Sequence, residues 1–267
     1  MQILNPDIYS DNNIAQYKKI FENGRPFKNL RINDFLSIDA ANHLADHFPG
    51  MDKMRKKYDG INERKAEDAN FAGIDIMFSE LKRELASSGF LKWLEQVSGL
   101  NELFTVEDQR GAGLHQGANG SFLDIHIDFN IHPLLNVHRR LNLIIFLNKQ
   151  WQTEWGGNLE FWDSKVKQCV TNYPPLFNDA IIFETNEISY HGYSMINVPA
   201  GITRKSYYNY FYTTRQLNVK YHDTVFKVRP NEGVLKAVMT TVKDLIKNNA
   251  KRGFRLIGLT TWFKKIE

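Results

Sequence analysis

The chain has 267 residues, 42% of them hydrophobic and 24% charged, which is long enough for one sizeable core and excludes a disordered chain. Its single cysteine, Cys169, excludes an intrachain disulfide. No apolar run approaches the roughly 20 residues of a membrane-spanning helix, and the first residues, MQILNPDIYSD, show no secretory signal. We therefore expect a soluble protein in the cytoplasm.

The N-terminal hundred residues contain two stretches with helical patterns. Residues 36–48 predict a helix that Ser37 caps and Pro49 ends. Residues 78–97 predict a second helix with a break near Ser87–Gly89. The polar, mixed region 50–75 between them is expected to be a loop or a poorly ordered flap.

From about residue 104 short apolar or alternating runs follow one another, separated by turn signals. The runs are LFTVE, GAGLH, FLDIHIDF, LNLIIFLN, NLEFW, AIIFE and SYYNYFYTT. Many short strands at regular spacing favour a sandwich or a barrel-like jelly roll. Residues 233–248 return to a helical pattern, in which one apolar stripe is more typical of core packing than of a partner site. The stripe consists of Leu235, Val238, Val242 and Leu245.

Positive charge is concentrated at the C-terminal end. Residues 215–267 hold 12 Lys and Arg against 4 Asp and Glu, whereas the preceding residues hold 22 against 26. Such asymmetry can mark a surface for nucleic acid or for an acidic partner. The simpler interpretation, a solvated basic tail, is preferred.

His126 and Asp128 lie one residue apart in FLDIHIDF, so a strand would project both side chains from the same face. Ile125, Ile127 and Phe129 would then point into apolar packing. Two histidines and one carboxylate form the facial triad of non-haem Fe(II) oxygenases, which leaves coordination positions open. The pair alone is a weak signal, because a hydrogen-bonded His–Asp pair on a strand looks the same.

The third ligand must come from another histidine. His191 stands out because it follows the strand AIIFE and precedes a strand headed by Arg204, whose guanidinium could clamp the far carboxylate of an organic-acid co-substrate. His43 and His47 have metal-ligand spacing on the first helix, but their surroundings indicate an ordinary half-exposed face. The remaining histidines are expected to be structural: His115 in a Gly-rich turn, His132 and His138 in a loop, and His222 in the basic tail.

With RRLNLIIFLNKQW, EWGGNLEFWD, FNDAIIFE and HGYSMINVPAGITRKSYYNYFYT around this set, residues 100–214 resemble the Fe(II)/2-oxoglutarate-dependent dioxygenases of the prolyl 4-hydroxylase type. The resemblance implies a mainly β fold, a double-stranded β-helix (jelly roll, cupin-like) flanked by N-terminal helices and a C-terminal helix. We expect an oxygenase domain over residues 1–214, with helical support over about 1–100 and the jelly-roll core over about 100–214. Residues 215–267 would form a basic, partly helical extension.

Carried over by position, the resemblance makes His126, Asp128 and His191 the iron ligands and Arg204 the partner of the distal carboxylate of 2-oxoglutarate. Further residues expected to face or pack against the co-substrate are Asn142, Ile144, Phe146 and Leu159. Phe146 stands where several relatives have a tyrosine that helps the arginine. Ser206 and Tyr208, which share strand parity with Arg204, are the expected replacements.

The function implied is hydroxylation of an unactivated C–H by Fe(II), 2-oxoglutarate and O2, with succinate and CO2 as co-products and ascorbate as a further candidate cofactor. Asp128 fills the position that related halogenases leave open for chloride, so hydroxylation is the default; desaturation or cyclisation begins with the same hydrogen abstraction. The first-choice substrate is a peptidyl or free, proline-like amino acid. The alternatives are a glycan or a natural-product intermediate.

Three other readings stay open. A non-catalytic jelly-roll binding module would tolerate loss of any ligand, and a cupin-type metalloenzyme without 2-oxoglutarate would not need Arg204. An oxygenase acting on nucleic acid would use the basic tail, but that tail offers few aromatic residues for stacking beyond Phe254, Trp262 and Phe263. Nucleic acid and membranes are therefore not expected as partners, and a small molecule or peptide is.

Overall fold

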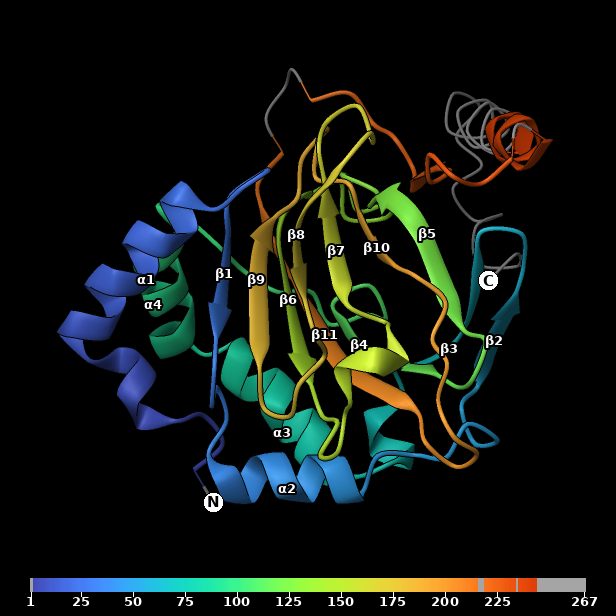
Figure 1. Cartoon of the computed structure of the whole chain (residues 1–267). Helices are drawn as coiled ribbons and strands as arrows, with labels where there is room; N and C mark the ends of the chain where they lie inside the picture. The colour runs from blue at the N-terminus through green and yellow to red at the C-terminus, as the bar shows by residue number, and fades with distance from the viewer. Residues whose placement is uncertain (1, 216–218, 234, 244–267) are drawn as a thin grey trace.

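The computed structural model describes residues 2–215, 219–233 and 235–243 (Figure 1). The helices are η1 (Pro6–Tyr9), α1 (Asp11–Asn23), α2 (Ile38–Asp46), η2 (Phe71–Gly73), α3 (Ile76–Leu85), α4 (Ser88–Ser98) and η3 (Thr153–Trp155). Residues 235–243 are also helical. The strands are β1 (Asn29–Ile32), β2 (Lys56–Asp59), β3 (Glu63–Asp68), β4 (Ala112–Gly117), β5 (Phe122–Ile127), β6 (His138–Phe146), β7 (Leu159–Trp162), β8 (Cys169–Tyr173), β9 (Ala180–Glu184), β10 (His191–Tyr193), β11 (Arg204–Thr213) and β12 (Val225–Lys227).

The strands form one antiparallel sheet in the order β1-β9-β6-β11-β4-β3-β5-β10-β7-β8, with β12 added to β5 and β2 added to β3. The sheet curls so that its two halves face each other, because Phe146 and Phe183 from one half pack in one cluster with Phe161 from the other. The rings of Phe161 and Phe183 lie 5.1 Å apart. This confirms the expected mainly β, jelly-roll fold with supporting helices.

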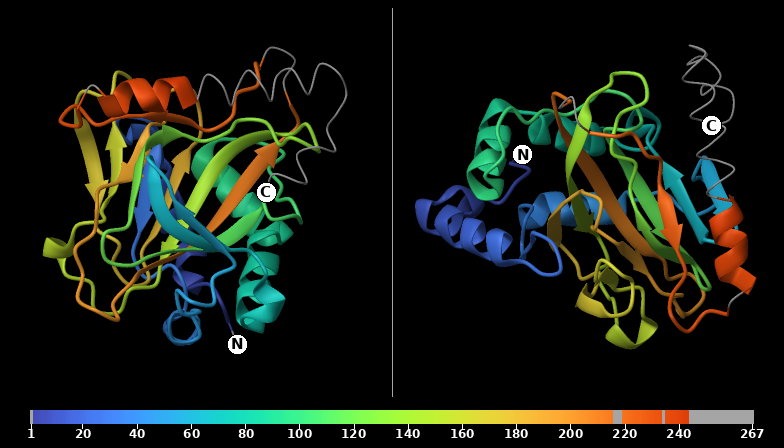
Figure 2. Two further views of the ribbon diagram at one scale, coloured as in Figure 1. Left: turned by 90° about the vertical axis from the view of Figure 1, so that its right-hand side faces the viewer. Right: turned by 90° about the horizontal axis from the view of Figure 1, so that it is seen from above.

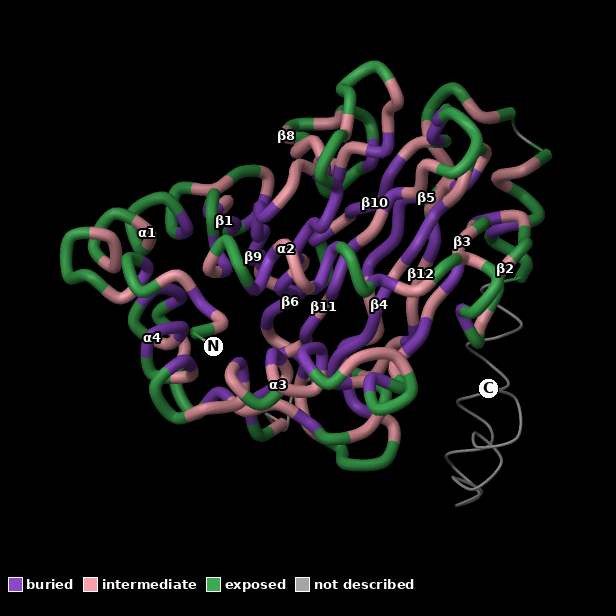
Figure 3. Tube along the Cα trace, turned by 90° about the horizontal axis from the view of Figure 1, so that it is seen from below, coloured by how far each residue is buried: buried purple, intermediate pink, exposed green. Residues whose placement is uncertain are grey.

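Alternation along β6 separates the barrel interior from the helical layer. Leu141, Leu143 and Ile145 belong to the large core that the sheet shares with α2, α3 and α4. Ile144 and Phe146, of opposite parity, join the interior aromatic cluster instead. Figure 3 shows the buried backbone running along these central strands, while the exposed stretches lie on the outer helices and turns.

The predicted helix starts are confirmed. The Ser37 hydroxyl accepts a hydrogen bond from the Ala40 N–H at the start of α2, which ends at Asp46 before Pro49. The predicted break near Ser87 separates α3 from α4, and Ser87 is the N-cap of α4 through the N–H of Phe90. Both helices bury their apolar faces against the outside of the sheet, so the core fixes their orientation.

The expectation of a loop over residues 50–75 is wrong, because β2 and β3 form a hairpin and β3 is inserted between β4 and β5. The sequence of β3 is polar because oppositely charged side chains along this strand pair with one another. Lys65 Nζ lies 3.2 Å from Glu63 Oε2 and 2.6 Å from Glu67 Oε1, and side chains two residues apart share one face. Ala66, on the other face, is completely buried.

The helix over residues 235–243 also differs from expectation. Its apolar stripe is not core packing, since Leu235, Val238 and Val242 are 74%, 53% and 48% exposed; Leu245 lies outside the described residues. Its polar face contacts the body instead, and Figure 2 shows this helix lying along one side of the barrel. Within the described ranges, no helix is both long and apolar enough to cross a membrane.

Candidate metal centre

Two neighbouring antiparallel strands bring the proposed ligands together. His126 lies on β5, Asp128 follows one residue after its end, and His191 opens β10. The pairing of β5 with β10 places His126 directly opposite His191, with ring centroids 4.3 Å apart. Asp128 lies between the two imidazoles: its Oδ1 is 3.6 Å from His126 Nε2, and its Oδ2 is 3.4 Å from His191 Nε2. One ligand atom of each side chain lies within 4.8 Å of the others.

Both imidazoles are oriented by backbone carbonyls. His126 Nδ1 lies 2.9 Å from the carbonyl oxygen of Asp124, and His191 Nδ1 lies 2.9 Å from that of Ser189. Donation of the Nδ1 proton to these carbonyls leaves the Nε2 lone pairs free to face Asp128. Ring orientation by a second hydrogen bond is typical of metal-binding histidines.

Charge in the centre is set by a buried arginine that the sequence analysis missed. Arg139 Nη2 donates to Asp128 Oδ2 at 2.7 Å, and the guanidinium lies over the ring of Tyr210 at 3.4 Å. Burial by itself opposes ionisation of Asp128, but Arg139 and then His191 outweigh it and hold the pKa of that carboxyl well below its usual range. Burial, and then His126, lower the pKa of His191 to about 3. At neutral pH the set is therefore a carboxylate beside a neutral His191 imidazole, as metal binding requires.

Arg204 is buried in the same interior without a carboxylate. Its Nε donates to the carbonyl oxygen of Gly157 at 2.8 Å, and its Cζ lies 4.9 Å and 4.4 Å from the ring centroids of Phe146 and Tyr193. Burial lowers its pKa to about 10, so the guanidinium stays charged at neutral pH. None of the carboxylates in the described part of the chain forms an ion pair with it. A buried cation without a protein anion is costly, which favours an anionic ligand at this position.

The other residues expected to line the pocket lie on β6, β7 and β11. Asn142, Ile144 and Phe146 share the inner face of β6, and the buried Asn142 Oδ1 lacks a hydrogen-bond partner among the described residues. Leu159 packs in the cluster of Phe146. Ser206 and Tyr208 have the same strand parity as Arg204 on β11, and Ser206 is paired in register with Phe146.

Tyr193 is a second residue that the sequence analysis missed. Besides its ring contact with Arg204, its hydroxyl lies 3.1 Å from His115 Nε2. A spacing of two residues from His191 could have indicated it, because i and i+2 share a strand face. His115 lies on β4 and not in a turn, and His138 opens β6 and not a loop, so both expectations of their setting are wrong.

The donor set fits Fe(II) and a 2-oxo acid. Two imidazole nitrogens and one carboxylate on one side of a metal are the ligands of non-haem iron. The uncompensated Arg204 and the unpaired Asn142 Oδ1 lie on the neighbouring strands β11 and β6. A planar guanidinium is suited to a carboxylate through two parallel hydrogen bonds.

Residues 112–212 match the model of the 2OG-Fe(II) oxygenase superfamily. The chain is 27% identical over 176 residues to prolyl 3-hydroxylase OGFOD1 of Mus musculus, a match that covers 64% of this chain and 30% of that protein. This chain therefore spans less than a third of the length of the curated relative that it matches.

Solved structures show the same fold at low identity. A prolyl-4-hydroxylase from Pseudomonas putida superposes with a TM-score of 0.52 at 15% identity, over 75% of this chain and 99% of that one. A prolyl hydroxylase from Trichoplax adhaerens, in complex with a hypoxia inducible factor oxygen degradation domain peptide fragment, gives 0.55 at 13% identity, over 79% of this chain and 98% of that one. These likenesses to solved structures show the fold, and the match to the 2OG-Fe(II) oxygenase superfamily model lies within its strands, over residues 112–212.

Proposed function

We propose that the protein hydroxylates an unactivated C–H bond of a polar substrate, a peptidyl or free, proline-like amino acid, with succinate and CO2 as co-products. The observation that carries this proposal is the His126–Asp128–His191 set facing the same interior as an unpaired, buried Arg204. A cupin-type metalloenzyme without 2-oxoglutarate would have no use for that cation. A binding module would not need the ionised carboxylate held between two imidazoles.

His126, Asp128 and His191 would hold Fe(II), and Arg204 would hold the distal carboxylate of 2-oxoglutarate. Bound together, the metal and the co-substrate supply the activation of O2 and the transfer of one oxygen atom to carbon. The role of the chain is to orient these groups and to exclude water. Asn142, Ile144, Phe146 and Leu159 form the surrounding wall, and Ser206 and Tyr208 complete the β11 side.

Phe146 stands where several relatives have a tyrosine that helps the arginine, and Tyr193 is the best-supported replacement for that tyrosine here. Its ring already contacts Arg204, and its hydroxyl lies on β10, the strand of His191. Burial raises the pKa of Tyr193 to about 12, so the hydroxyl keeps its proton and can donate it to a carboxylate. Ser206 and Tyr208 remain the competing donors.

A cavity of about 290 Å³ lined mainly by polar residues supports the proposal of a polar substrate. Its walls come from the β2–β3 hairpin, from Gln109 and from Tyr208. Tyr208 stacks on Tyr210 at 5.0 Å, and Tyr210 covers the guanidinium of Arg139, which donates to Asp128, so a chain of side-chain contacts connects the cavity wall with the proposed metal centre. The lining residues are Arg55, Lys56, Glu67, Asp68, Ala69, Gln109 and Tyr208, a mixed set of charges suited to a polar substrate. The prolyl hydroxylases among the relatives support an amino-acid substrate.

The test has two stages. Anaerobic addition of Fe(II) and 2-oxoglutarate should give a weak visible charge-transfer band, and admission of air should yield slow succinate without any substrate. Absence of both would overturn the proposal. Incubation with peptides and metabolites, followed by a search for mass gains of one oxygen atom, then identifies the substrate; a glycan or natural-product hit would correct its class.

A further inference from the structure

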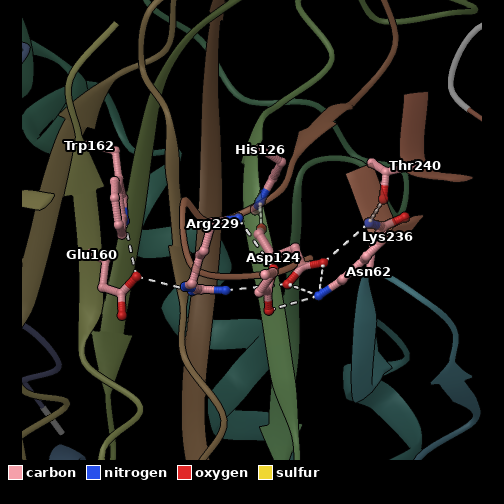
Figure 4. Close-up of polar contacts among 9 residues, drawn as sticks. Asn62, Asp124, His126, Glu160, Trp162, Arg229, Lys236 and Thr240 are labelled. Atoms are coloured by element: carbon pink, nitrogen blue, oxygen red, sulfur yellow. Dashed lines mark hydrogen bonds and ion pairs between the residues drawn. The ribbon is translucent and has the colours of Figure 1, made fainter. Parts of the chain in front are cut away.

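Asp124, two residues before His126 on β5, is a buried carboxylate with a side-chain exposure of 0%. Its backbone carbonyl is the group that orients the His126 ring. Its carboxylate receives both of its cations from the C-terminal segment, beyond the part of the chain that matches the family model. Arg229 Nη1 lies 3.2 Å from Oδ1 and Lys236 Nζ lies 2.9 Å from Oδ2, while Asn62 Nδ2 donates to Oδ2 at 3.2 Å (Figure 4). The solvated-tail interpretation is therefore wrong for these two cations.

Arg229 also reaches the strand on the other side of β10. Its Nη2 lies 3.0 Å from Glu160 Oε2 on β7, and the same oxygen accepts the indole N–H of Trp162 at 3.0 Å (Figure 4). In the sheet, β10 lies between β5 and β7, and His191 is paired with both His126 and Phe161. One guanidinium therefore ties together the two strands that flank the strand of His191.

Two further contacts join this segment to the centre. β12 pairs with β5 so that Phe226 lies opposite His126, with ring centroids 5.4 Å apart. The helix over residues 235–243 is anchored at the β2–β3 turn, where Asn62 Nδ2 donates to Thr240 Oγ1 at 2.8 Å. The C-terminal segment thus contacts β5, β7 and the β2–β3 turn.

We infer that Arg229, supported by Lys236, is a positioning residue of the metal centre: it clamps β5 and β7 on either side of β10 and so fixes the distance between His126 and His191. The working oxygenase unit then extends through residue 243 and does not end at residue 214. This inference rests on the proposed iron site. Loss of groups that orient metal ligands typically costs about 10- to 100-fold in metal affinity.

The test compares three full-length variants in an anaerobic Fe(II) titration with excess 2-oxoglutarate, followed by the charge-transfer band. Arg229→Gln removes both ends of the clamp. Glu160→Gln removes only the β7 end and leaves Asp124 with both cations, so it serves if Arg229→Gln fails to fold. Arg64→Gln is the matched control, because Arg64 on β3 also borders β5 but forms only an exposed pair with Asp59.

If the clamp acts as proposed, Arg229→Gln and Glu160→Gln should bind Fe(II) about tenfold or more weakly than wild-type protein, measured at temperatures far below their melting points. Arg64→Gln should bind Fe(II) with unchanged affinity. Unchanged affinity in both clamp variants would overturn it, even if their melting temperatures fall. If wild-type protein gives no band, the proposed function fails instead. The role of the clamp is then tested by titrating the same variants with Co(II), whose visible absorption reports binding at the histidines without 2-oxoglutarate. This titration uses a His47→Ala background, which removes the second histidine cluster described next.

A separate observation points to a second metal site on the outside of the molecule. His43 and His47 lie one turn apart on α2, and the fold brings Asp75, the N-cap of α3, to them. His43 Nε2 lies 3.1 Å from Asp75 Oδ1, and one ligand atom of each residue lies within 4.8 Å of the others. His47 Nδ1 lies 2.9 Å from the carbonyl oxygen of His43, an orientation that leaves its Nε2 available. His126 and His191 are likewise oriented by a backbone carbonyl at Nδ1, although there the carbonyl lies two residues earlier on a strand.

We propose that His43, His47 and Asp75 bind a divalent ion of the zinc class, with water completing the coordination. Imidazole and carboxylate donors suit zinc, copper and nickel, and a solvent-facing site leaves room for water. Because Asp75 comes from 28 residues beyond His47, helix spacing alone did not reveal the site.

Calorimetric titration of wild-type protein with Zn(II) should show two sites, and His47→Ala should show one. His222→Ala is the matched control, because His222 pairs with Glu187 at 3.2 Å but lies outside both three-residue groups. It should keep both sites. The same number of sites in His47→Ala as in wild-type protein would refute this assignment.

Discussion

Arg139 Nη2 lies 2.7 Å from Asp128 Oδ2, behind the carboxylate that two imidazoles face from the front. The arginine is 1% exposed and its guanidinium contacts the rings of Phe129 and Tyr210. A carboxylate in this position has its charge stabilised by a fixed cation, yet it keeps one side open to a metal. The Arg139–Asp128 pair therefore contributes to the stability of the barrel and also keeps Asp128 ionised for metal binding.

Arg139→Ala should be strongly destabilising, by about 3–5 kcal/mol, because it removes the cation that pairs with the largely buried Asp128 carboxylate. Arg139→Lys should lose less, since an ammonium keeps the charge but not the planar contact with Tyr210. Urea unfolding of the metal-free proteins measures both. Asp128→Asn in the Arg139→Ala background should recover part of the loss. Additive losses in the double variant would contradict the coupling.

The metal-free protein should lose stability as the pH falls below about 6.5. The folded pKa of His191 is about 3, because burial and then His126 disfavour the charged ring, whereas an unfolded histidine titrates near 6.5. Between these values the unfolded state binds the proton and the folded state does not, so unfolding becomes easier as pH falls. The limiting slope is about 1.4 kcal/mol per pH unit for one such group.

The measurement is the unfolding free energy from urea titrations between pH 7 and pH 5. His138, whose pKa burial and then Arg140 lower to about 4, adds to the slope in the same direction. His191→Gln should therefore have a shallower pH dependence than wild type but not a flat one. An identical slope in His191→Gln would show that this imidazole is not the depressed group.

The strands around the proposed metal site were predictable because local alternation defines them. His126 and Asp128 stand out as polar residues in an apolar run, and strand parity puts Ile144 and Phe146 on one face of β6, where they pack in one cluster. Their pairing with the rest of the site was not predictable in the same way. The opposition of His126 to His191 depends on a register between strands 65 residues apart, which no local pattern carries.

The misses have the same origin. Arg139 and Arg140 are adjacent, and only the register of β6 decides that the first is buried behind Asp128 while the second pairs with Glu184 at the edge. The β2–β3 hairpin resembled a loop because Lys65 satisfies its charges only in the folded strand. In the C-terminal segment, Lys236 is indistinguishable in sequence from a solvated lysine until Asp124 is found beside it.

Arg204→Ala should abolish 2-oxoglutarate binding and leave metal binding unchanged, because the guanidinium lies away from the three ligands and has no protein carboxylate to serve. Fluorescence-detected metal titration and 2-oxoglutarate titration in the presence of the metal separate the two effects. Lys205→Ala is the matched control, since Lys205 is the next residue on β11 but faces Asp46 outside the barrel. Wild-type 2-oxoglutarate affinity in Arg204→Ala would mean that another group anchors the co-substrate.

Three conservative variants decide which hydroxyl assists Arg204. Tyr193→Phe should weaken 2-oxoglutarate binding by about tenfold or more, because a hydrogen bond to a charged group contributes about 1.5–3 kcal/mol. Ser206→Ala and Tyr208→Phe should change it little, since the ring of Tyr193 contacts the guanidinium directly. Metal affinity should be unchanged in all three, which separates loss of a donor from distortion of β10. If Ser206→Ala or Tyr208→Phe shows the larger loss, the donor comes from the strand of Arg204, and the Tyr193 hydroxyl serves only its hydrogen bond with His115.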